Sequence, residues 1–135
     1  EQNELVHYVD VPLPGPRLPH DMAFTENFAL LGDFPLFWEP ELLAKGAHVA
    51  RFHPERPTRF GVIPRRGKSS DIRWFEAEST FVLHFVNAYE DGDEAAAHRA
   101  SRSWPPRRGG WECVLERRSI EQHGTCCNIR HNTDA

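Results

Sequence analysis

The sequence predicts an all-β fold, because short apolar segments alternate with turn signals about every ten residues and only one stretch looks helical. The segments with strand character cover residues 4–10, 20–25, 28–38, 59–64, 72–77 and 80–89. Many short strands at this spacing are typical of a β-sandwich, a barrel or a propeller. The chain has 135 residues, 39% of them hydrophobic, which is the length of about one domain and enough for a folded core.

The elements before residue 60 are defined by their turns and ends. Residues 4–10, ELVHYVD, alternate loosely and stop at a Pro-Gly-Pro stretch, as a strand does before a turn. HDMAFT and FALLGDFPLFW have the pattern of two strands in a tight hairpin around a Thr-Glu-Asn turn. PELLAKG, residues 40–46, is the helical-looking piece, with Pro40 suited to a first turn and Gly46 to a stop.

Residues 80–89, TFVLHFVNAY, are apolar on both alternating faces. One side carries Phe81, Leu83 and Phe85, and the other carries Val82, His84 and Val86. A strand of this kind is expected to be buried on both sides, as in stacked sheets. We therefore expect His84 to be shielded from water, with hydrogen-bond partners for its ring nitrogens.

The composition excludes several classes of function. Residues 1–95 carry 9 Lys and Arg against 16 Asp and Glu, net −7, and residues 96–135 carry 7 against 4, net +3, which sum to −4. The acidic main body argues against a nucleic-acid partner, which needs clustered basic residues. No apolar run approaches the roughly 18 residues of a membrane span, and the acidic start has no signal-peptide pattern.

The three cysteines all lie near the end of the chain, and two are adjacent. An odd number with this spacing is no disulfide framework, so we expect reduced thiols and a cytoplasmic location. A zinc site is conceivable there but fits no C-x-x-C plus H-x₃-H pattern, and we disfavour it. Its ligands would come from Cys113, His123, Cys126, Cys127 and His131.

The pattern of strands is expected to stop at Glu94. Residues 95–135 show no sustained period of two or of 3.6, change charge sign and are rich in Arg, Trp, Pro and Gly. We predict an irregular tail, disordered or arising from a frameshifted or mis-joined translation. A natural, lineage-specific surface extension is the alternative.

Two histidines stand out, His20 before an apolar segment and His84 inside one. A histidine in an apolar strand is more often a hydrogen-bonded core residue than a metal ligand. Spacing alone cannot pair two residues 64 positions apart, because distant ligands meet only in the fold. The other six histidines lie in polar or turn-like contexts and receive no role.

Three motifs resemble those of the carotenoid cleavage oxygenases, a family that includes lignostilbene dioxygenases and the retinal isomerase of the eye. HDMAFTENFALLGDFPL is similar to the family's H-D-F-A-I-T-E-N-Y, and RPTRFGVIPRRG to its D-P-x-x-P-x-R-F-G-V-x-P-R. IRWFEAESTFVLHFVNAYEDGDE is similar to I-x-W-F-x-x-x-x-x-F-x-x-H-x-x-N-A-x-E-x-G-D-E. The motifs keep the family's order, and the resemblance covers residues 1–94.

The resemblance implies a seven-bladed β-propeller that holds Fe(II) on its axis through four histidines. By position, His20 matches the second family ligand and His84 the third. Neutral imidazoles suit ferrous iron, and open coordination positions admit O₂. The implied reaction is oxidative cleavage of a conjugated C=C bond in a carotenoid, apocarotenoid or stilbenoid, placed by an apolar tunnel.

Other residues of the motifs are candidates for supporting roles. The polar companions of the histidines are candidates for second-shell or purely structural roles. Aromatic residues of the strands are candidates for contact with a polyene or stilbene substrate, although such residues more often belong to the core. The polar candidates are Asp21, Thr25, Asn87 and Glu90, and the aromatic ones Phe24, Phe81, Phe85 and Trp74.

The chain departs from the family pattern in its extent. Counterparts of the first and fourth ligands are not found in it. A propeller blade takes about 40–45 residues, so residues 1–94 amount to about two blades of a partial propeller. We therefore expect a fragment that is inactive alone. The resemblance leaves room for a peripheral membrane contact in the full-length form, although the sequence shows no apolar patch for it. The alternative is a non-catalytic β-repeat protein that oligomerises through its sheet edges, where two copies join their histidines across a two-fold axis.

Overall fold

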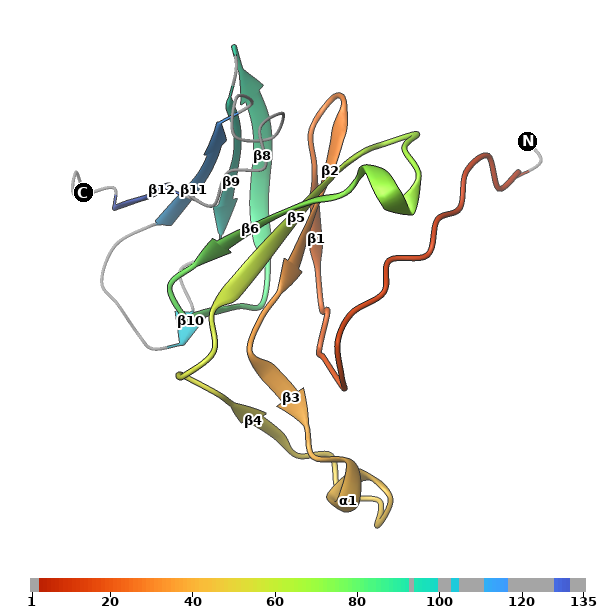
Figure 1. The fold of residues 1–135 in the computed structure, drawn as a ribbon, viewed down its shortest axis with the longest axis vertical. Helices are drawn as coiled ribbons and strands as arrows, with labels where there is room; N and C mark the ends of the chain where they lie inside the picture. Colours follow the sequence, from red (N-terminus) through yellow and green to blue (C-terminus); the bar gives the residue numbers. More distant parts are fainter. Residues whose placement is uncertain (1–2, 93, 100–102, 105–110, 117–127, 132–135) are drawn as a thin grey trace.

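The computed structural model describes residues 3–92, 94–99, 103–104, 111–116 and 128–131, and within these it is all-β with one short α-helix (Figure 1). The predicted fold class is confirmed in this respect. The elements are β1 (Met22–Phe24), β2 (Phe28–Asp33), β3 (Leu36–Trp38), α1 (Pro40–Leu43), β4 (Ala50–Phe52), β5 (Thr58–Pro64), the 3₁₀ turn η1 (Ser69–Asp71), β6 (Arg73–Ala77), β7 (Phe81–Val82), β8 (Phe85–Asp91), β9 (Glu94–Arg99), β10 (Ser103–Trp104), β11 (Trp111–Glu116) and β12 (Asn128–His131).

The first sheet is antiparallel, with strand order β1-β2-β5-β6. The predicted hairpin is confirmed, since β1 pairs with β2 from Met22 opposite Leu31 to Phe24 opposite Ala29. Thr25 closes the turn: its backbone N–H donates to the Phe28 carbonyl at 2.9 Å, and its hydroxyl accepts from the Phe28 N–H at 3.0 Å. Such side-chain bonds to nearby backbone favour turns over continued strand.

The second sheet, with strand order β12-β11-β9-β8, extends past the expected end of the strand pattern. The expectation of an irregular tail from residue 95 onward is wrong for residues 95–99, 103–104, 111–116 and 128–131, which form strands. The three alanines at 95–97 hide the strand character of β9 in the sequence, because alanine is depleted in strands. All three are buried, and Ala97 belongs to the core. The rest of the tail lies outside the described residues, and its origin stays a prediction.

The core lies between the two sheets, and β1 and β8 are the edge strands that face each other (Figure 1). They run in the same direction, because Asp21 contacts Phe85 at one end and Asn27 contacts Glu90 at the other. Most of the buried core residues come from the first sheet and from the loop after β2. Side chains of β7, β8 and β9 complete the core cluster. The buried members are Ala23, Leu30, Phe34, Phe60, Val62, Phe75, Val82 and Ala97.

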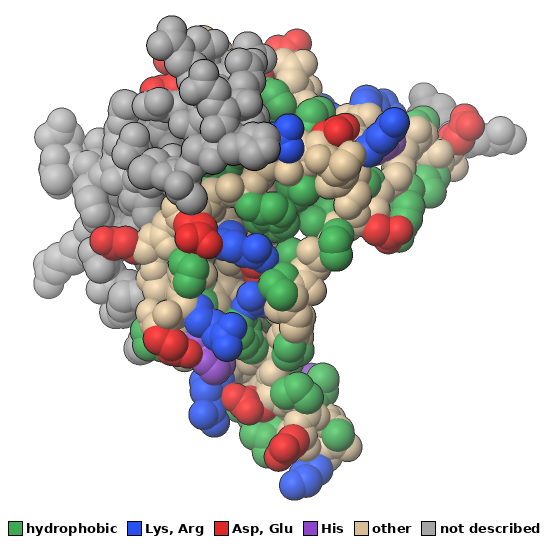
Figure 2. All heavy atoms as spheres, in the orientation of Figure 1, with side chains coloured by type: hydrophobic (Ala, Val, Ile, Leu, Met, Phe, Trp, Pro, Cys, Tyr) green, Lys and Arg blue, Asp and Glu red, His purple; other side chains and the backbone are tan. Residues whose placement is uncertain are grey.

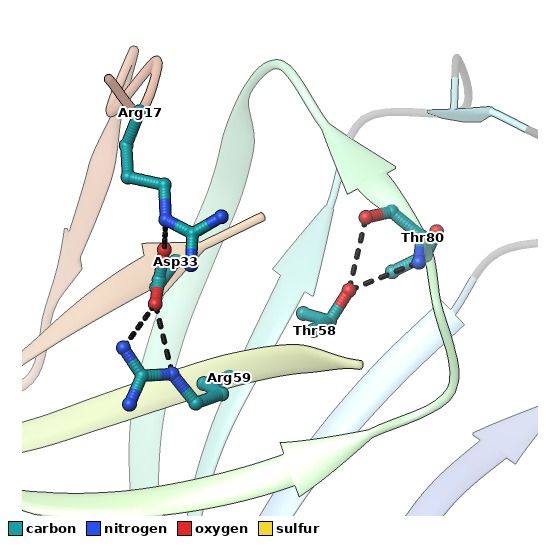
Figure 3. Close-up of polar contacts among 5 residues, drawn as sticks. All are labelled: Arg17, Asp33, Thr58, Arg59 and Thr80. Carbon is teal, nitrogen blue, oxygen red and sulfur yellow. Dashed lines mark hydrogen bonds and ion pairs between the residues drawn. The ribbon is translucent and has the colours of Figure 1, made fainter. Parts of the chain in front are cut away.

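A buried ion cluster holds the outer part of the first sheet (Figure 3). The Asp33 carboxylate is 1% exposed; Arg17 Nε lies 2.9 Å from its Oδ1, and Arg59 Nε donates to its Oδ2 at 2.8 Å. Two guanidinium groups thus offset one buried charge, Arg59 through hydrogen bonds and Arg17 through an ion pair whose atoms, Arg17 Nε and Asp33 Oδ1, make no hydrogen bond to any described residue. Beside it, the buried Thr58 hydroxyl donates to the Thr80 carbonyl and accepts from the Thr80 N–H, both at 2.9 Å.

Three strand predictions need correction. Residues 4–10 pair with no strand in the described part of the chain, and Leu5 and Tyr8 are 78% and 72% exposed. The segment is held instead by contacts such as His7 Nε2 to the Gly67 carbonyl at 3.0 Å. Residues 28–38 form two strands rather than one, because the chain turns at Phe34 and Pro35 into the separate β3–β4 pair.

The third correction concerns residues 80–89, which do not form one strand buried on both faces. The chain breaks between β7 and β8, at Leu83 and His84. His84 is exposed rather than shielded, with 55% of its side-chain surface accessible. Beyond the break a bulge interrupts the pairing of β8 with β9 between Phe85 and Asn87, and Val86 is 69% exposed. Alternation assigns faces correctly only along an unbroken strand.

Two four-stranded antiparallel sheets that meet along their edge strands have the arrangement of two neighbouring propeller blades. The α-helix is shorter than the predicted range, but it ends as expected, since Gly46 has a φ of +80° that favours glycine. No helix within the described ranges is long and apolar enough to cross a membrane.

Candidate metal centre

The structure brings His20 and His84 together. His20 precedes β1 and His84 precedes β8, so each stands at the start of a facing edge strand. Their ring centroids are 5.0 Å apart and the ring planes make an angle of 82°. Both side chains are exposed. This histidine pair therefore presents two imidazoles to the same small volume, although the residues are 64 positions apart in the sequence.

Asp21 ties the two strand starts together beneath the rings. Its carboxylate accepts the Met22 N–H at 2.8 Å and the Phe85 N–H at 3.0 Å. The hydrogen bond from Phe85, which favours the charged form, holds the pKa of Asp21 below its usual range. The same carboxylate lies 3.6 Å from His84 Nδ1, too long for a hydrogen bond, and it faces that nitrogen with a negative charge.

The other polar candidates lie further along the two strands. Glu90 is at the far end of β8, where its carboxylate accepts the Asn27 backbone N–H and the Asn27 side-chain amide, both at 2.9 Å. Thr25 serves the β1–β2 turn, and Asn87 is exposed beside the bulge of β8. Of the predicted companions only Asp21 approaches the histidine pair directly.

The aromatic candidates separate into core and surface. Phe81 and Phe85 pack around Phe34, with ring centroids 5.6 Å and 6.4 Å from it. The Trp74 ring lies under the Arg59 guanidinium at 4.7 Å. Phe24, in contrast, is 53% exposed. The Arg65 guanidinium lies over the Phe24 ring at 5.8 Å, further away than Arg59 lies from Trp74. Contact with a substrate stays a prediction for all four, and Phe24 has the exposed surface for it.

A cavity of about 710 Å³ runs along the outer face of the first sheet, with His20 and Asp21 at its wall. Its other lining is largely apolar: Met22 and Phe24 from β1, and Val9 and Leu13 from the N-terminal segment. Figure 2 shows hydrophobic side chains along that segment and over the neighbouring sheet. The cavity has the size and the apolar character usual for a small-molecule site.

The two imidazoles could serve as two ligands of one metal ion, because their ring centroids are 5.0 Å apart. Neutral imidazole suits Fe(II). Among the described residues no group of three or more His, Cys, Asp and Glu side chains could hold a metal ion.

Sequence reasoning missed Asn27. It stands inside the first motif, where a turn explains it, and its partner Glu90 is 63 positions away. The sequence offered one indirect signal: the Thr-Glu-Asn turn of the first motif and the acidic end of the third motif belong to the same family pattern. The contact itself appears only in the fold.

Two blade-like sheets with a histidine before each facing edge strand agree with the family that the three sequence motifs indicate. The chain belongs to the family described as retinal pigment epithelial membrane protein, the carotenoid cleavage oxygenases, whose model matches residues 1–122. The expected family is confirmed, and the match extends beyond the 94 residues that carry the motifs.

Curated relatives support the same family over part of their length. The chain is 40% identical over 88 residues to the carotenoid 9,10(9′,10′)-cleavage dioxygenase of Crocus sativus, covering 64% of this chain and 16% of the relative. It is 40% identical over 74 residues to the isoeugenol monooxygenase of Pseudomonas putida, covering 55% and 16%. The chain thus spans about a sixth of the length of these relatives.

Solved structures share the fold. The lignostilbene dioxygenase of Pseudomonas brassicacearum superposes with a TM-score of 0.73 at 20% identity, over 95% of this chain and 30% of that one. The cobalt-substituted ACO of Synechocystis gives 0.69 at 18% identity, over 88% and 28%. At this identity the likeness concerns the fold alone.

Proposed function

We propose that this chain supplies His20 and His84 as two of the ligands of a ferrous centre in an oxygenase that cleaves a conjugated C=C bond with O₂. The substrate class is a carotenoid, an apocarotenoid or a stilbenoid. The relatives named for cleavage of carotenoids and of resveratrol support that class. In this proposal two further ligands come from outside this chain, which is inactive alone.

The observation that carries the proposal is the histidine pair itself. The two rings are 5.0 Å apart and exposed, and neither side chain is part of the core. A buried histidine is usually explained by the hydrogen bonds that it makes. Two adjacent exposed imidazoles at the starts of facing edge strands are arranged as ligands of one shared ion would be, which supports the proposal.

Each residue has a distinct task in the proposed site. A bound ferrous ion would supply the binding and the reduction of O₂. His20 and His84 would hold that ion through neutral nitrogens. Asp21 faces Nδ1 of His84 and therefore favours a proton on that nitrogen, which leaves Nε2 free as a ligand. The negative charge of Asp21 would also offset part of the positive charge of the metal.

The apolar cavity beside His20 is the proposed contact surface for the substrate. Phe24 is the candidate for stacking on a polyene or an aromatic ring, because its ring is exposed and lines the cavity. Met22, 44% exposed on the same strand, would extend the apolar wall. These side chains would exclude water from the substrate next to the metal.

Metal content tests the proposal. The purified chain is dialysed to equilibrium against Fe(II) without oxygen, because a site with only two of its ligands holds the ion weakly, and bound iron is measured for the wild type and for the double variant His20→Ala/His84→Ala. We expect iron in the wild type and its loss in the variant. The matched control is His48→Ala/His53→Ala, which removes two histidines at the β3–β4 hairpin and keeps the iron. Equal iron in both variants would contradict the proposal.

A second candidate function is a β-repeat protein that oligomerises through sheet edges. The observation that favours it is β6, which within the described part of the chain pairs with β5 only and so leaves one edge for another chain. Size-exclusion chromatography with light scattering separates the two. A stable dimer that binds no iron supports the interaction protein, whereas iron binding by the monomer supports the oxygenase.

A further inference from the structure

The two facing edge strands lack the usual connection between neighbouring strands. β1 and β8 run in the same direction and lie in contact, but they belong to different sheets and form no backbone ladder with each other. Their relative position along the strand axis is therefore free of the register that a ladder imposes. Since His20 and His84 stand at the starts of these strands, any slip of one strand separates the two rings.

Carboxylates connect the strands at both ends, one from each sheet. At the histidine end, Asp21 of the first sheet accepts the Phe85 N–H of the second at 3.0 Å. At the other end, Glu90 of the second sheet accepts both the backbone and the side-chain N–H of Asn27 of the first, each at 2.9 Å. Hydrogen bonds to a charged acceptor are about twice as strong as neutral ones, and a bidentate pair also fixes orientation.

The Asn27–Glu90 contact acts on the histidines from a distance. Phe85 and Glu90 are five positions apart on β8, which corresponds to about 17 Å along a strand. Two connections so far apart prevent both sliding and tilting of β8 against β1, whereas either alone would leave a pivot. The bulge between Phe85 and Asn87 makes the second connection necessary, because it interrupts the pairing that would otherwise stiffen the start of β8.

We propose that Asn27 and Glu90 are positioning residues for the histidine pair, which together with the Asp21–Phe85 hydrogen bond lock β8 against β1 and so hold two metal ligands in place. The inference rests on the proposed function in that the two histidines are taken as metal ligands. The connection between the strands is independent of that function. It assigns a role to Asn27, which the motif alone placed only in a turn.

The test is an exchange of the two side chains. Asn27→Asp sets two carboxylates against each other and breaks the contact by repulsion. In the double variant Asn27→Asp/Glu90→Gln, the glutamine carbonyl accepts the backbone N–H and its amide donates to the new carboxylate. The double variant restores the net charge of the wild type together with the pair of hydrogen bonds. Glu90→Ala, which removes the bonds without repulsion, separates the two effects. Glu26→Gln, an exposed carboxylate in the same turn, is the matched control for removing a charge.

The first readout needs no metal. In NMR spectra of the histidine rings, assigned with His20→Gln and His84→Gln, the wild type is expected to show a nuclear Overhauser cross-peak between the two rings. The cross-peak disappears in Asn27→Asp and in Asp21→Asn, returns in Asn27→Asp/Glu90→Gln and persists in Glu26→Gln. If Asn27→Asp does not fold, Glu90→Ala replaces it, since it frees the Asn27 donors to water without repulsion.

The second readout is a titration with Zn(II), which leaves the ring signals observable. Both rings are expected to shift over one range of concentration in the wild type, with an affinity about tenfold lower in Asn27→Asp, the usual size for losing a residue that orients a ligand. If zinc fails to shift the two wild-type rings together, the proposed metal site fails, and the cross-peaks alone still decide the positioning role. That role is overturned if the wild type lacks the cross-peak, if folded Asn27→Asp keeps it, or if the double variant does not restore it.

Discussion

The core between the two sheets and the histidine pair differ in how they are held. In the core, Phe75, Leu30 and Val62 are each 1% exposed, and the polar atoms next to it are paired, as at Thr58 and Thr80. At the histidine pair, both rings project into solvent, and their position is set from behind by carboxylates that bind backbone amides. The core determines whether the chain folds, and the strand connections determine where two imidazoles meet.

The largest expected effect comes from the centre of the core. Phe75→Ala removes a buried ring from β6 and leaves a cavity, so it should lower the free energy of unfolding by about 3–5 kcal/mol. Denaturant unfolding followed by circular dichroism measures this. The matched control is Phe24→Ala on β1, where the ring is 53% exposed and the cost should stay below about 1 kcal/mol. Equal losses would mean that the first sheet is not packed as described.

The buried ion cluster should rank next. Asp33→Ala leaves the Arg17 and Arg59 guanidiniums without their shared carboxylate, and removing one partner of a buried ion pair costs about 3 kcal/mol. The comparison is the pair Glu39–Arg51, with 2.8 Å between Oε1 and Nε, in which the carboxylate side chain is 29% exposed against 1% for Asp33. Glu39→Ala should cost less than about 1 kcal/mol. A loss for Asp33→Ala as small as for Glu39→Ala would show that the cluster is solvated.

A smaller effect is expected where one hydroxyl satisfies two backbone groups. Thr58→Val keeps the shape but leaves the Thr80 N–H and carbonyl without that partner, at a cost of about 2 kcal/mol. Thr58→Ser retains the hydroxyl and should recover most of the loss. Thermal unfolding of the two variants measures the difference. If serine were no better than valine, packing rather than hydrogen bonding would hold Thr58.

The smallest effect on stability should come from the histidines. His20→Ala and His84→Ala each remove an exposed ring, so each should change the free energy of unfolding by less than about 0.5 kcal/mol without metal. The same unfolding measurement provides the value. A loss of several kcal/mol in either variant would place that histidine in the folding core, which is the more common role of a histidine in an apolar strand.

The contrast also explains which features the sequence could predict. The β1–β2 hairpin, the helix start at Pro40 and strand β5 follow from local patterns, and each was confirmed. The burial of His84 was wrong, because a break at Leu83 cannot be read from alternation. Strand β9 was missed because alanine is depleted in strands, and the burial of its three alanines becomes visible only in the fold. The Asn27–Glu90 contact joins residues 63 positions apart and belongs to no pattern.

The central claim is that the core sets the stability of the chain while His20 and His84 bind the metal. Unfolding with and without Fe(II), under exclusion of oxygen, tests it most directly. A ligand that binds only the folded state stabilises it by about 2.7 kcal/mol at a hundredfold excess over its dissociation constant. We predict that ferrous ion raises the unfolding midpoint of the wild type. The double variant His20→Ala/His84→Ala should match the wild type without iron and gain nothing from it. A variant that gains the same stabilisation as the wild type, or that is already unstable without iron, would contradict the assignment of His20 and His84 as an exposed pair of metal ligands.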